Sequence, residues 1–294
     1  MKISRVGNYK TGFKYYKNKV EITNSDEINK IKLLKIPPAY ENVTIINNKK
    51  IIAYGYDSKN RKQVLYNPNF IAKQNIIKYK KISSSIKFFS KLKKKIARDL
   101  SNTDEKIKAI AIIITLIFTC GFRIGNKKYE KENNSVGLTT LKYTHLKFEN
   151  NKILIDFIGK KGVRNLAYCN HRIINEYLNN KYKITSSKDD YIFSYGTNKI
   201  ITSNDVNEYL KKISNYYSDT EINTIITTKD LRTWNANTLF IGYFKKLKKD
   251  DNSNIEKNIK KAIEMVAEKL HNTYSICKKS YIDPEIIANI TKSK

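Results

Sequence analysis

Two arginines and a tyrosine near the C-terminus stand in the most distinctive local contexts of this 294-residue chain. They are Arg123 in the segment CGFRIGN, Arg232 in KDLRTW and Tyr281 in LHNTYSICKKSYIDP. Two guanidinium groups can hold the oxygens of a phosphate, and a phenolic oxygen can attack its phosphorus to form a covalent intermediate. The three residues therefore predict cleavage of a phosphodiester by a tyrosine nucleophile.

The charge of the chain indicates a polyanionic partner. The sequence contains 57 Lys and Arg against 27 Asp and Glu, which gives a net charge of +30. An AT-rich coding sequence would enrich lysine, but it would not remove the acids that balance it, so we favour a nucleic acid as the partner. The hydrophobic content of 40%, with 21 Tyr and 11 Phe, is sufficient for packed cores and excludes a disordered basic tail.

The cysteines and histidines form no pattern typical of a disulfide framework or a metal site. Each type occurs three times at wide spacing, as Cys120, Cys169, Cys277 and His145, His171, His271. We therefore expect reduced thiols, a cytoplasmic location, and no bound metal or other cofactor.

No segment predicts a secretory or membrane role. The N-terminal residues MKISR lack the apolar stretch of a signal peptide. The longest apolar stretch, residues 109–122, is too short to cross a bilayer and is interrupted by Thr115, Thr119 and Gly121. This stretch predicts a buried core helix instead.

Residues 1–80 predict a β-rich domain. Apolar runs at residues 43–46, 50–54 and 63–66 have strand character, and turn signals separate them. After Tyr79 the spacing of the apolar residues becomes helical, and one face of the expected helix carries Ile86, Phe89, Leu92 and Ile96. This change of pattern places a domain boundary near residue 80.

Residues 81–294 predict a mainly helical domain with a β insertion, so the expected fold class is α+β. Asp104 begins a helix that ends near Gly121. Residues 145–148 and 153–158 alternate as strands do, and a tight turn at 159–162 leads into a third strand at 163–168. Lys160 is therefore expected at the tip of a β-hairpin. The lysine-rich run 245–251 predicts a solvated loop, and the last residues are expected to fray.

Further segments, in a characteristic order, carry a resemblance to a known family. Ahead of the arginine and tyrosine segments lie IPPAYENV at 36–43, DSKNRKQ at 57–63, YNP at 66–68 and the pair Lys78-Tyr79. With them, the chain resembles the type IB DNA topoisomerases, in particular the small poxvirus-like and bacterial branch, over nearly its whole length. The resemblance implies a catalytic fold shared with the tyrosine recombinases, a β-rich N-terminal domain that clamps duplex DNA, and a monomer.

The resemblance also implies roles for the two arginines. By itself, Arg123 fits a helix-terminal arginine that binds backbone carbonyls, and Arg232 fits a surface helix with an Asp–Arg pair. The segment 129–141, with Gly137 and Leu138 in register, resembles the family stretch that follows the first catalytic arginine, and KDLRTW resembles the stretch around the second. Both side chains would then hold oxygens of the scissile phosphate.

The segment FIGKKGV at residues 157–163 resembles the family hairpin in which the lysine directly after glycine is catalytic. This register selects Lys160, and Lys161 is the alternative. Without a catalytic role, either lysine would simply be a solvated turn residue. A catalytic lysine here would protonate the departing 5′ oxygen, and general acids contribute about two to four powers of ten to a rate.

The residues ahead of Tyr281 leave a choice between two neighbours. Poxvirus members of the family carry histidine nine residues before the tyrosine, and some bacterial-type relatives carry asparagine there, preceded by glycine. In this chain position 272 is asparagine and position 271 is histidine. The resemblance assigns the hydrogen bond to the phosphate to Asn272, whose amide donates without titrating, and leaves His271 as the alternative.

The expected activity is relaxation of supercoiled duplex DNA through a 3′-phosphotyrosyl intermediate. The sequence has no Gly-x-x-x-x-Gly-Lys-Ser/Thr loop and no carboxylate cluster, so neither ATP nor a metal is expected to take part. Two alternatives stay open. A tyrosine recombinase usually carries histidine where this chain has Lys229, and a non-catalytic DNA-binding protein would explain the charge but not the ordered segments.

Overall fold

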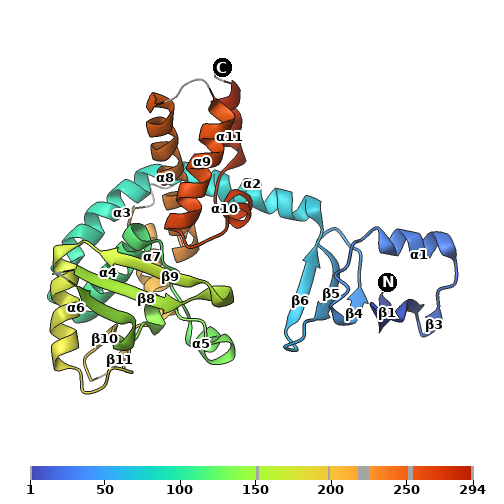
Figure 1. The fold of residues 1–294 in the computed structure, drawn as a ribbon, viewed down its shortest axis with the longest axis horizontal. Helices are drawn as coiled ribbons and strands as arrows, with labels where there is room; N and C mark the ends of the chain where they lie inside the picture. The colour runs from blue at the N-terminus through green and yellow to red at the C-terminus, as the bar shows by residue number, and fades with distance from the viewer. Residues whose placement is uncertain (1, 150–151, 198, 218–224, 251–253, 293–294) are drawn as a thin grey trace. The chain divides into compact units, whose positions relative to one another are not determined.

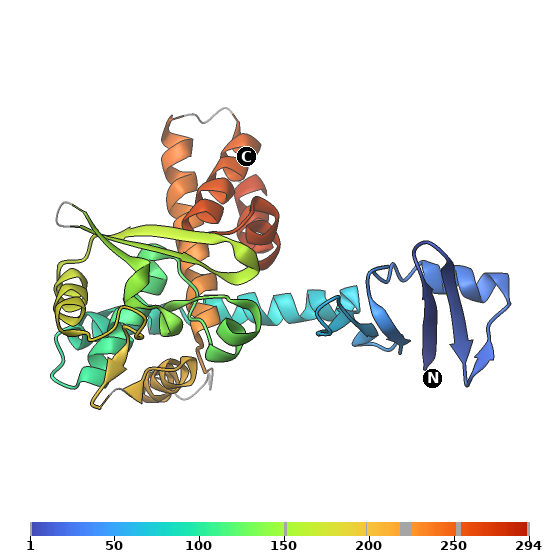
Figure 2. The ribbon, with the colours of Figure 1, turned by 60° about the horizontal axis from the view of Figure 1, so that its bottom comes forward.

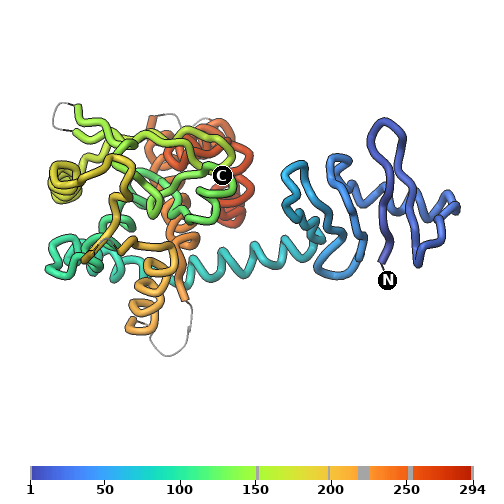
Figure 3. The backbone as a smooth tube through the Cα atoms, turned by 90° about the horizontal axis from the view of Figure 1, so that it is seen from below, coloured from blue at the N-terminus to red at the C-terminus, as the bar shows by residue number. Residues whose placement is uncertain are grey.

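The computed structural model describes residues 2–149, 152–197, 199–217, 225–250 and 254–292. The chain divides into two compact units, Met1–Lys80 and Lys81–Lys294. Figure 1 labels their helices and strands, and the backbone tube of Figure 3 lets the reader follow the element order from one end of the chain to the other. The N-terminal part is rich in β-structure and the C-terminal part is mainly helical, which confirms the expected α+β class.

The N-terminal unit is built on a six-stranded antiparallel sheet of order β3-β2-β1-β4-β5-β6. The strands are β1 (Ile3–Asn8), β2 (Gly12–Lys17), β3 (Val20–Glu21), β4 (Glu41–Ile45), β5 (Ile51–Tyr56) and β6 (Lys62–Tyr66), with helix α1 (Ser25–Lys32) between β3 and β4. The last three strands were predicted from the sequence. Its core comprises Tyr15, Ile22, Ile31, Val43, Ile45, Ile52 and Ala53.

Arg5 holds the proline-containing segment of the N-terminal unit. Its side chain is buried and donates to the carbonyls of Pro37 at 3.0 Å and Tyr40 at 2.6 Å. The guanidinium also lies 4.2 Å from the centre of the Phe13 ring. A single arginine of β1 therefore satisfies backbone groups that an extended proline segment leaves without a sheet partner.

Two sequence predictions around the start of the helical region are wrong. Helix α2 (Pro68–Ser84) begins well before Tyr79, and Ile86 is 58% exposed although it was assigned to the buried face of the next helix. The isoleucines Ile71, Ile76 and Ile77 of α2 are exposed, so this helix lacks the apolar periodicity by which helices are recognised in a sequence.

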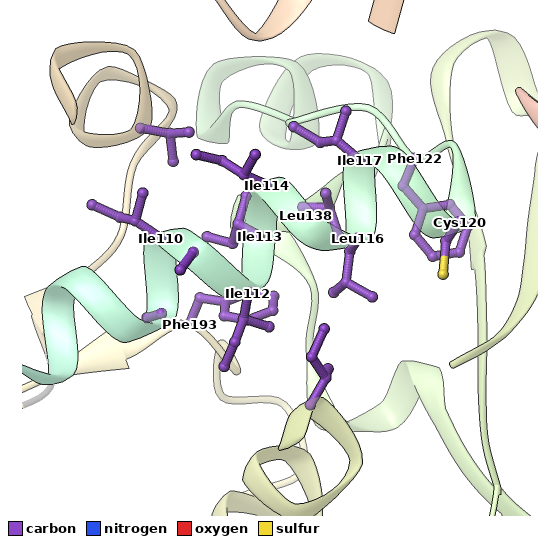
Figure 4. Packing of buried hydrophobic residues seen from close by; sticks show 14 of the residues in the cluster. Ile110, Ile112, Ile113, Ile114, Leu116, Ile117, Cys120, Phe122, Leu138 and Phe193 are labelled. Carbon is purple, nitrogen blue, oxygen red and sulfur yellow. The ribbon is translucent and has the colours of Figure 1, made fainter. Parts of the chain in front are cut away.

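Helix α4 (Glu105–Cys120) forms the centre of the larger unit. Asp104 caps its start by accepting from the backbone N–H groups of Lys106 and Ile107, and Gly121 ends it in the left-handed conformation at φ 69°. Its isoleucines are buried on several sides of the helix, as Figure 4 shows for Ile110, Ile112, Ile113, Ile114 and Ile117. The prediction of a buried core helix is confirmed. Among the described residues, no helix combines the length and apolar character needed to cross a membrane.

The larger unit contains further helices and two small sheets besides α4. They are α3 (Ile86–Asp99), α5 (Lys127–Asn133), α6 (Arg172–Ile184), α7 (Ser203–Tyr217), α8 (Thr228–Asp250), α9 (Ile255–Lys269), α10 (Tyr274–Ser280), α11 (Pro284–Lys292), the hairpin β10 (Ser194–Tyr195) and β11 (Lys199–Ile200), and the three-stranded antiparallel sheet of β7 (Leu146–Glu149), β8 (Lys152–Ile158) and β9 (Arg164–Cys169). This sheet is the predicted β insertion, and Figure 2 shows its long hairpin.

Helix α8 extends further than the sequence indicated. It continues to Asp250, so residues 245–250 are helical and the prediction of a loop is wrong. The lysines there are exposed, whereas Leu247 packs on the cluster formed by α8, α9 and α10. Because packing against α9 stabilises this end of the helix, local composition did not reveal it. The last residue of the predicted loop, and the final two residues expected to fray, lie outside the described ranges.

Candidate active site

Arg232 is buried at the centre of the predicted site. It lies near the start of α8, its exposed fraction is 4%, and it donates from Nη1 to the Gly121 carbonyl and from Nη2 to the Leu270 carbonyl at 3.1 Å. These carbonyls belong to the ends of α4 and α9. A surface Asp–Arg pair is excluded, because Asp230 instead accepts from Lys81 at 2.8 Å. Arg232 therefore joins the two helix ends that lead into Arg123 and Asn272.

The close approach of α4 and α9 requires glycine at position 121. A Cβ added to Gly121 would lie 2.0 Å from the carbonyl oxygen of Lys269, which no side chain could tolerate. The left-handed backbone conformation at this residue favours glycine as well. Gly121 thus lets the backbone turn directly from α4 into Arg123 while it contacts the end of α9.

Arg123 contacts Asn272 across 149 residues of sequence. Its Nη2 donates to Oδ1 of Asn272 at 2.5 Å. The backbone of Arg123 is fixed by Leu138, whose N–H donates to the Arg123 carbonyl at 2.9 Å. Gly137 makes this pairing sterically feasible, because a Cβ there would lie 2.4 Å from the Cα of Gly125. The 137–138 segment therefore positions the backbone of Arg123. No hydrogen bond that the structure describes joins this segment to the Arg123 guanidinium.

His271 and Asn272 form the C-terminal cap of α9. The Asn272 N–H donates to Ala267 O at 2.9 Å and the His271 N–H donates to Glu268 O at 3.0 Å, the two bonds of a Schellman motif. His271 occupies its left-handed position, at φ 51°, where glycine is usually found. The motif directs the next side chain, that of Asn272, towards Arg123.

The imidazole of His271 faces the end of α4. Its Nε2 lies 3.0 Å from the Cys120 carbonyl oxygen, and its ring stacks on Phe122 with the centres 5.2 Å apart. Burial lowers the pKa of His271 from its ordinary value, and the nearby Arg232 and Arg123 lower it further against the opposing effect of the Cys120 carbonyl. At neutral pH the imidazole is therefore uncharged, and its Nε2–H donates to the carbonyl.

Tyr281 directly follows α10 and lies beside the arginines. The Cζ atom of Arg232 is 5.4 Å from the centre of its ring. Burial alone would raise the pKa of this phenol, but the positive charges and hydrogen bonds of Arg232 and Arg123 outweigh burial and lower the pKa below its ordinary value. A lowered pKa makes the phenolic oxygen a better nucleophile near neutral pH.

Asn237, which no local sequence signal indicated, holds the backbone that directly follows the Tyr281 side chain. This side chain of α8 is 5% exposed. Its Nδ2 donates to the Tyr281 carbonyl at 2.9 Å, and its Oδ1 accepts from the Asp283 N–H at 2.8 Å. The only signal in the sequence was its place five residues after Arg232 on one helix, and asparagine is too common in this chain for that to be decisive.

Lys160 lies in the β8–β9 turn, as predicted, and its side chain is exposed. The turn is closed by a hydrogen bond from the Gly159 N–H to the Val163 carbonyl at 2.8 Å. Lys161 is held at φ 64° in the left-handed conformation. Within the described parts of the chain, no hydrogen bond or ion pair joins Lys160 to Arg123, Arg232, Asn272 or Tyr281. The structure thus brings four of the five predicted residues together and leaves the lysine on a separate hairpin.

The cysteines and the charged residues of the unit add no further group to this site. All three cysteines are free and buried, and burial raises the pKa of Cys277, which lies one turn before Tyr281, to about 12. In the residues that the structure describes, no group of three or more His, Cys, Asp or Glu side chains could hold a metal ion.

Comparison with known proteins identifies the family. Residues 59–293 match the model of the eukaryotic DNA topoisomerase I catalytic core. DNA topoisomerase 1B of Acanthamoeba polyphaga mimivirus is 32% identical over 280 residues, which cover 91% of this chain and 81% of the relative. DNA topoisomerase 1B of Vaccinia virus (strain Copenhagen) is 27% identical, over 81% of this chain and 72% of the relative.

The chain therefore belongs to the type IB DNA topoisomerases, and within them it is of the poxvirus-like kind. It is an enzyme, as the sequence predicted. Among solved structures, XerA recombinase is similar at a TM-score of 0.42 and 14% identity, covering 68% of this chain and 61% of that one. XerH recombinase bound to its difH substrate is similar at a TM-score of 0.38 and 18% identity, covering 66% and 48%.

Proposed function

We propose that this topoisomerase relaxes supercoiled duplex DNA by cutting one strand through a 3′-phosphotyrosyl intermediate, allowing rotation, and resealing the strand. The observation that carries the proposal is a cluster in which Arg123 and Arg232 lie at the phenol of Tyr281 and Asn272 is bonded to Arg123. Three donors with two fixed positive charges beside one activated oxygen are the components that in-line attack on a phosphate requires.

The proposed roles follow from the free hydrogen-bond donors of each side chain. A guanidinium has five N–H donors. Arg232 uses two of them on the Gly121 and Leu270 carbonyls and also hydrogen-bonds Tyr281, so the N–H groups that are left are available to a phosphate. Its Nε has no hydrogen-bond partner within the described residues. Asn272 donates from Nδ2 to Leu270 O at 3.2 Å and keeps a second N–H for a phosphate oxygen.

In the proposed reaction, Tyr281 loses its phenolic proton to solvent, and its oxygen bonds to phosphorus as the bond from phosphorus to the 5′ oxygen breaks. Arg123, Arg232 and Asn272 stabilise the negative charge on the non-bridging oxygens. Lys160 gives a proton to the departing 5′ oxygen, for which its hairpin must bring the lysine to the DNA. The phosphotyrosine bond conserves the energy of the broken bond, so resealing by the 5′ hydroxyl needs neither ATP nor a metal ion.

The partner in this proposal is duplex DNA, bound by a monomer whose β-rich N-terminal unit acts as a clamp. The net charge of +30 supports this partner. We further propose a cytoplasmic site of action.

Relaxation of a supercoiled plasmid in EDTA, without ATP, tests the function. The parental enzyme should remove supercoils and form a covalent adduct with DNA, whereas Tyr281→Phe should do neither and still bind DNA, because only the nucleophilic oxygen is lost. A recombinase would leave a plasmid without its target site supercoiled, and a non-catalytic DNA-binding protein would form no adduct. A covalent adduct in Tyr281→Phe would exclude Tyr281 as the nucleophile.

A further inference from the structure

A buried asparagine lies next to the turn that carries Lys160. Asn165 of β9 is 2% exposed, whereas its neighbours on the strand, Arg164 and Leu166, are exposed. It therefore lies on the inner face of the three-stranded sheet, where it pairs with Phe157 of β8. A polar side chain in such a position costs free energy unless hydrogen bonds satisfy it, so its hydrogen bonds indicate what it does there.

The side chain of Asn165 holds the backbone of the turn. Its Nδ2 donates to the Val163 carbonyl at 2.8 Å, and the same oxygen accepts from the Gly159 N–H across the turn. A Cβ added to Gly159 would lie 2.4 Å from Nδ2 of Asn165. The amide is thus bonded to the residue that ends the turn and lies against the residue that leads into Lys160.

The tip of the turn depends on its two ends. Residues 160–162 are exposed, and Lys161 and Gly162 both have left-handed φ values, 64° and 73°. An exposed turn has no core packing of its own to fix its conformation. The bond from Asn165 acts at one of the two ends and therefore bears directly on where the tip lies.

The stem of the hairpin is fixed relative to Arg123. The segment 136–138 donates from one end to the Ile158 carbonyl at 3.0 Å and from the other end to the Arg123 carbonyl at 2.9 Å. Phe157 of the stem also packs edge-on against Phe122, with the ring centres 5.0 Å apart. Because the strand is placed with respect to the phosphate site up to the start of the turn, the conformation of the turn decides where the lysine points.

We propose that Asn165 is the positioning residue for Lys160. Its hydrogen bond to the Val163 carbonyl holds the turn in the conformation from which the ammonium group of the lysine reaches the departing 5′ oxygen. The inference rests on the proposed function for the role of Lys160, which gives its proton to that oxygen as the bond to phosphorus breaks. Asn165 acts through the lysine, so its loss should weaken the proton transfer alone.

The experiment compares single-turnover cleavage of two short duplexes that differ only in the 5′ bridging atom at the cleavage site, oxygen in one and sulfur in the other. A thiolate leaves without a proton, so sulfur removes a defect that is confined to the general acid. The variants are Asn165→Ala and Gly159→Ala, whose added Cβ would displace the Asn165 amide. Asn175→Ala is the matched control, because Nδ2 of Asn175 donates to the Cys169 carbonyl at 3.0 Å, at the other end of the same strand.

Asn165→Ala should cleave the oxygen duplex about ten- to a hundred-fold more slowly than the parent, and the sulfur duplex within about three-fold of the parental rate. Gly159→Ala should show the same pattern. The double variant should be no slower than Asn165→Ala, because alanine at position 165 removes the atom that the new Cβ would meet. Asn175→Ala should match the parent on both duplexes.

Three results would each overturn the proposal: a parental rate for Asn165→Ala on the oxygen duplex, an equal defect on both duplexes, or the same rescued defect in Asn175→Ala. If Asn165→Ala is unfolded at the assay temperature, Gly159→Ala decides by the same criteria, because it keeps the asparagine. Lys160→Ala is measured beside these variants. A Lys160→Ala defect that sulfur does not rescue shows that the proposed role of the lysine fails, whereas a rescued Lys160→Ala with an unrescued Asn165→Ala contradicts the role of Asn165 only.

Discussion

Replacing Asn272 with alanine tests how the cap of α9 serves the phosphate site. The substitution removes the oxygen that accepts from Arg123 Nη2 at 2.5 Å and also the N–H that we assign to a phosphate oxygen. His271, the alternative from the sequence, has its Nε2 on the Cys120 carbonyl instead. The structure therefore predicts a large effect at position 272 and a small one at position 271.

The expected magnitudes follow from the bonds lost. A hydrogen bond to a charged partner contributes about 1.5–3 kcal/mol, so Asn272→Ala should slow cleavage roughly 10- to 150-fold. His271→Gly loses one hydrogen bond, about 0.5–1.5 kcal/mol, and relieves a left-handed conformation that costs a non-glycine residue about 1–2 kcal/mol. These terms nearly cancel, so thermal stability should change little and cleavage should stay within a few-fold of the parental rate.

Single-turnover cleavage of a short duplex, with enzyme in excess, is the appropriate assay because it excludes product release. Asn272→His is the matched control, since an imidazole N–H would reach a similar position and retain substantial activity. His271→Ala keeps the strained backbone and loses the hydrogen bond, so it should be slightly less stable than His271→Gly. If His271→Gly abolishes cleavage while Asn272→Ala cleaves at the parental rate, then His271 and not Asn272 donates to the phosphate.

Three further substitutions separate the remaining roles. Lys160→Ala should slow cleavage by about two to four powers of ten, and replacing the 5′ bridging oxygen of the DNA with sulfur should restore the cleavage rate because a thiolate leaves without a proton. The control Lys161→Gly should cleave near the parental rate. Equal defects in the two variants would contradict the choice of Lys160 over Lys161. Arg123→Ala removes a positive charge that lowers the pKa of Tyr281, so the pKa rises and the ascending limb of residual cleavage against pH should move to higher pH; an unmoved limb refutes the coupling. Asn237→Ala leaves the Tyr281 carbonyl and the Asp283 N–H without their side-chain partner, at about 1–3 kcal/mol each, and should slow cleavage at least ten-fold with DNA affinity retained. A parental rate would show that these two hydrogen bonds are dispensable.

Local signals in the sequence were sufficient to predict helices and strands wherever neighbouring residues control the backbone conformation. Asp104 and Gly121 predicted both ends of α4, and the alternation around residues 145–168 predicted the β insertion with Lys160 in its turn. They were insufficient for α2 and for the end of α8. Three isoleucines of α2, Ile71, Ile76 and Ile77, are exposed, and the last turns of α8 depend on packing against α9.

The sequence by itself determined the family, the order of the catalytic segments and the identity of the candidate nucleophile, because these depend on residue types in short local contexts. Only the tertiary structure decided that Arg232 is buried between two helix ends, that Arg123 pairs with Asn272 and not with His271, and that Asn237 holds the backbone after Tyr281. Each of these contacts joins residues that are distant along the chain. The contacts of Arg232 and Arg123 depend on the ends of α4 and α9 meeting at Gly121, and no local pattern encodes where two packed helices will end relative to each other.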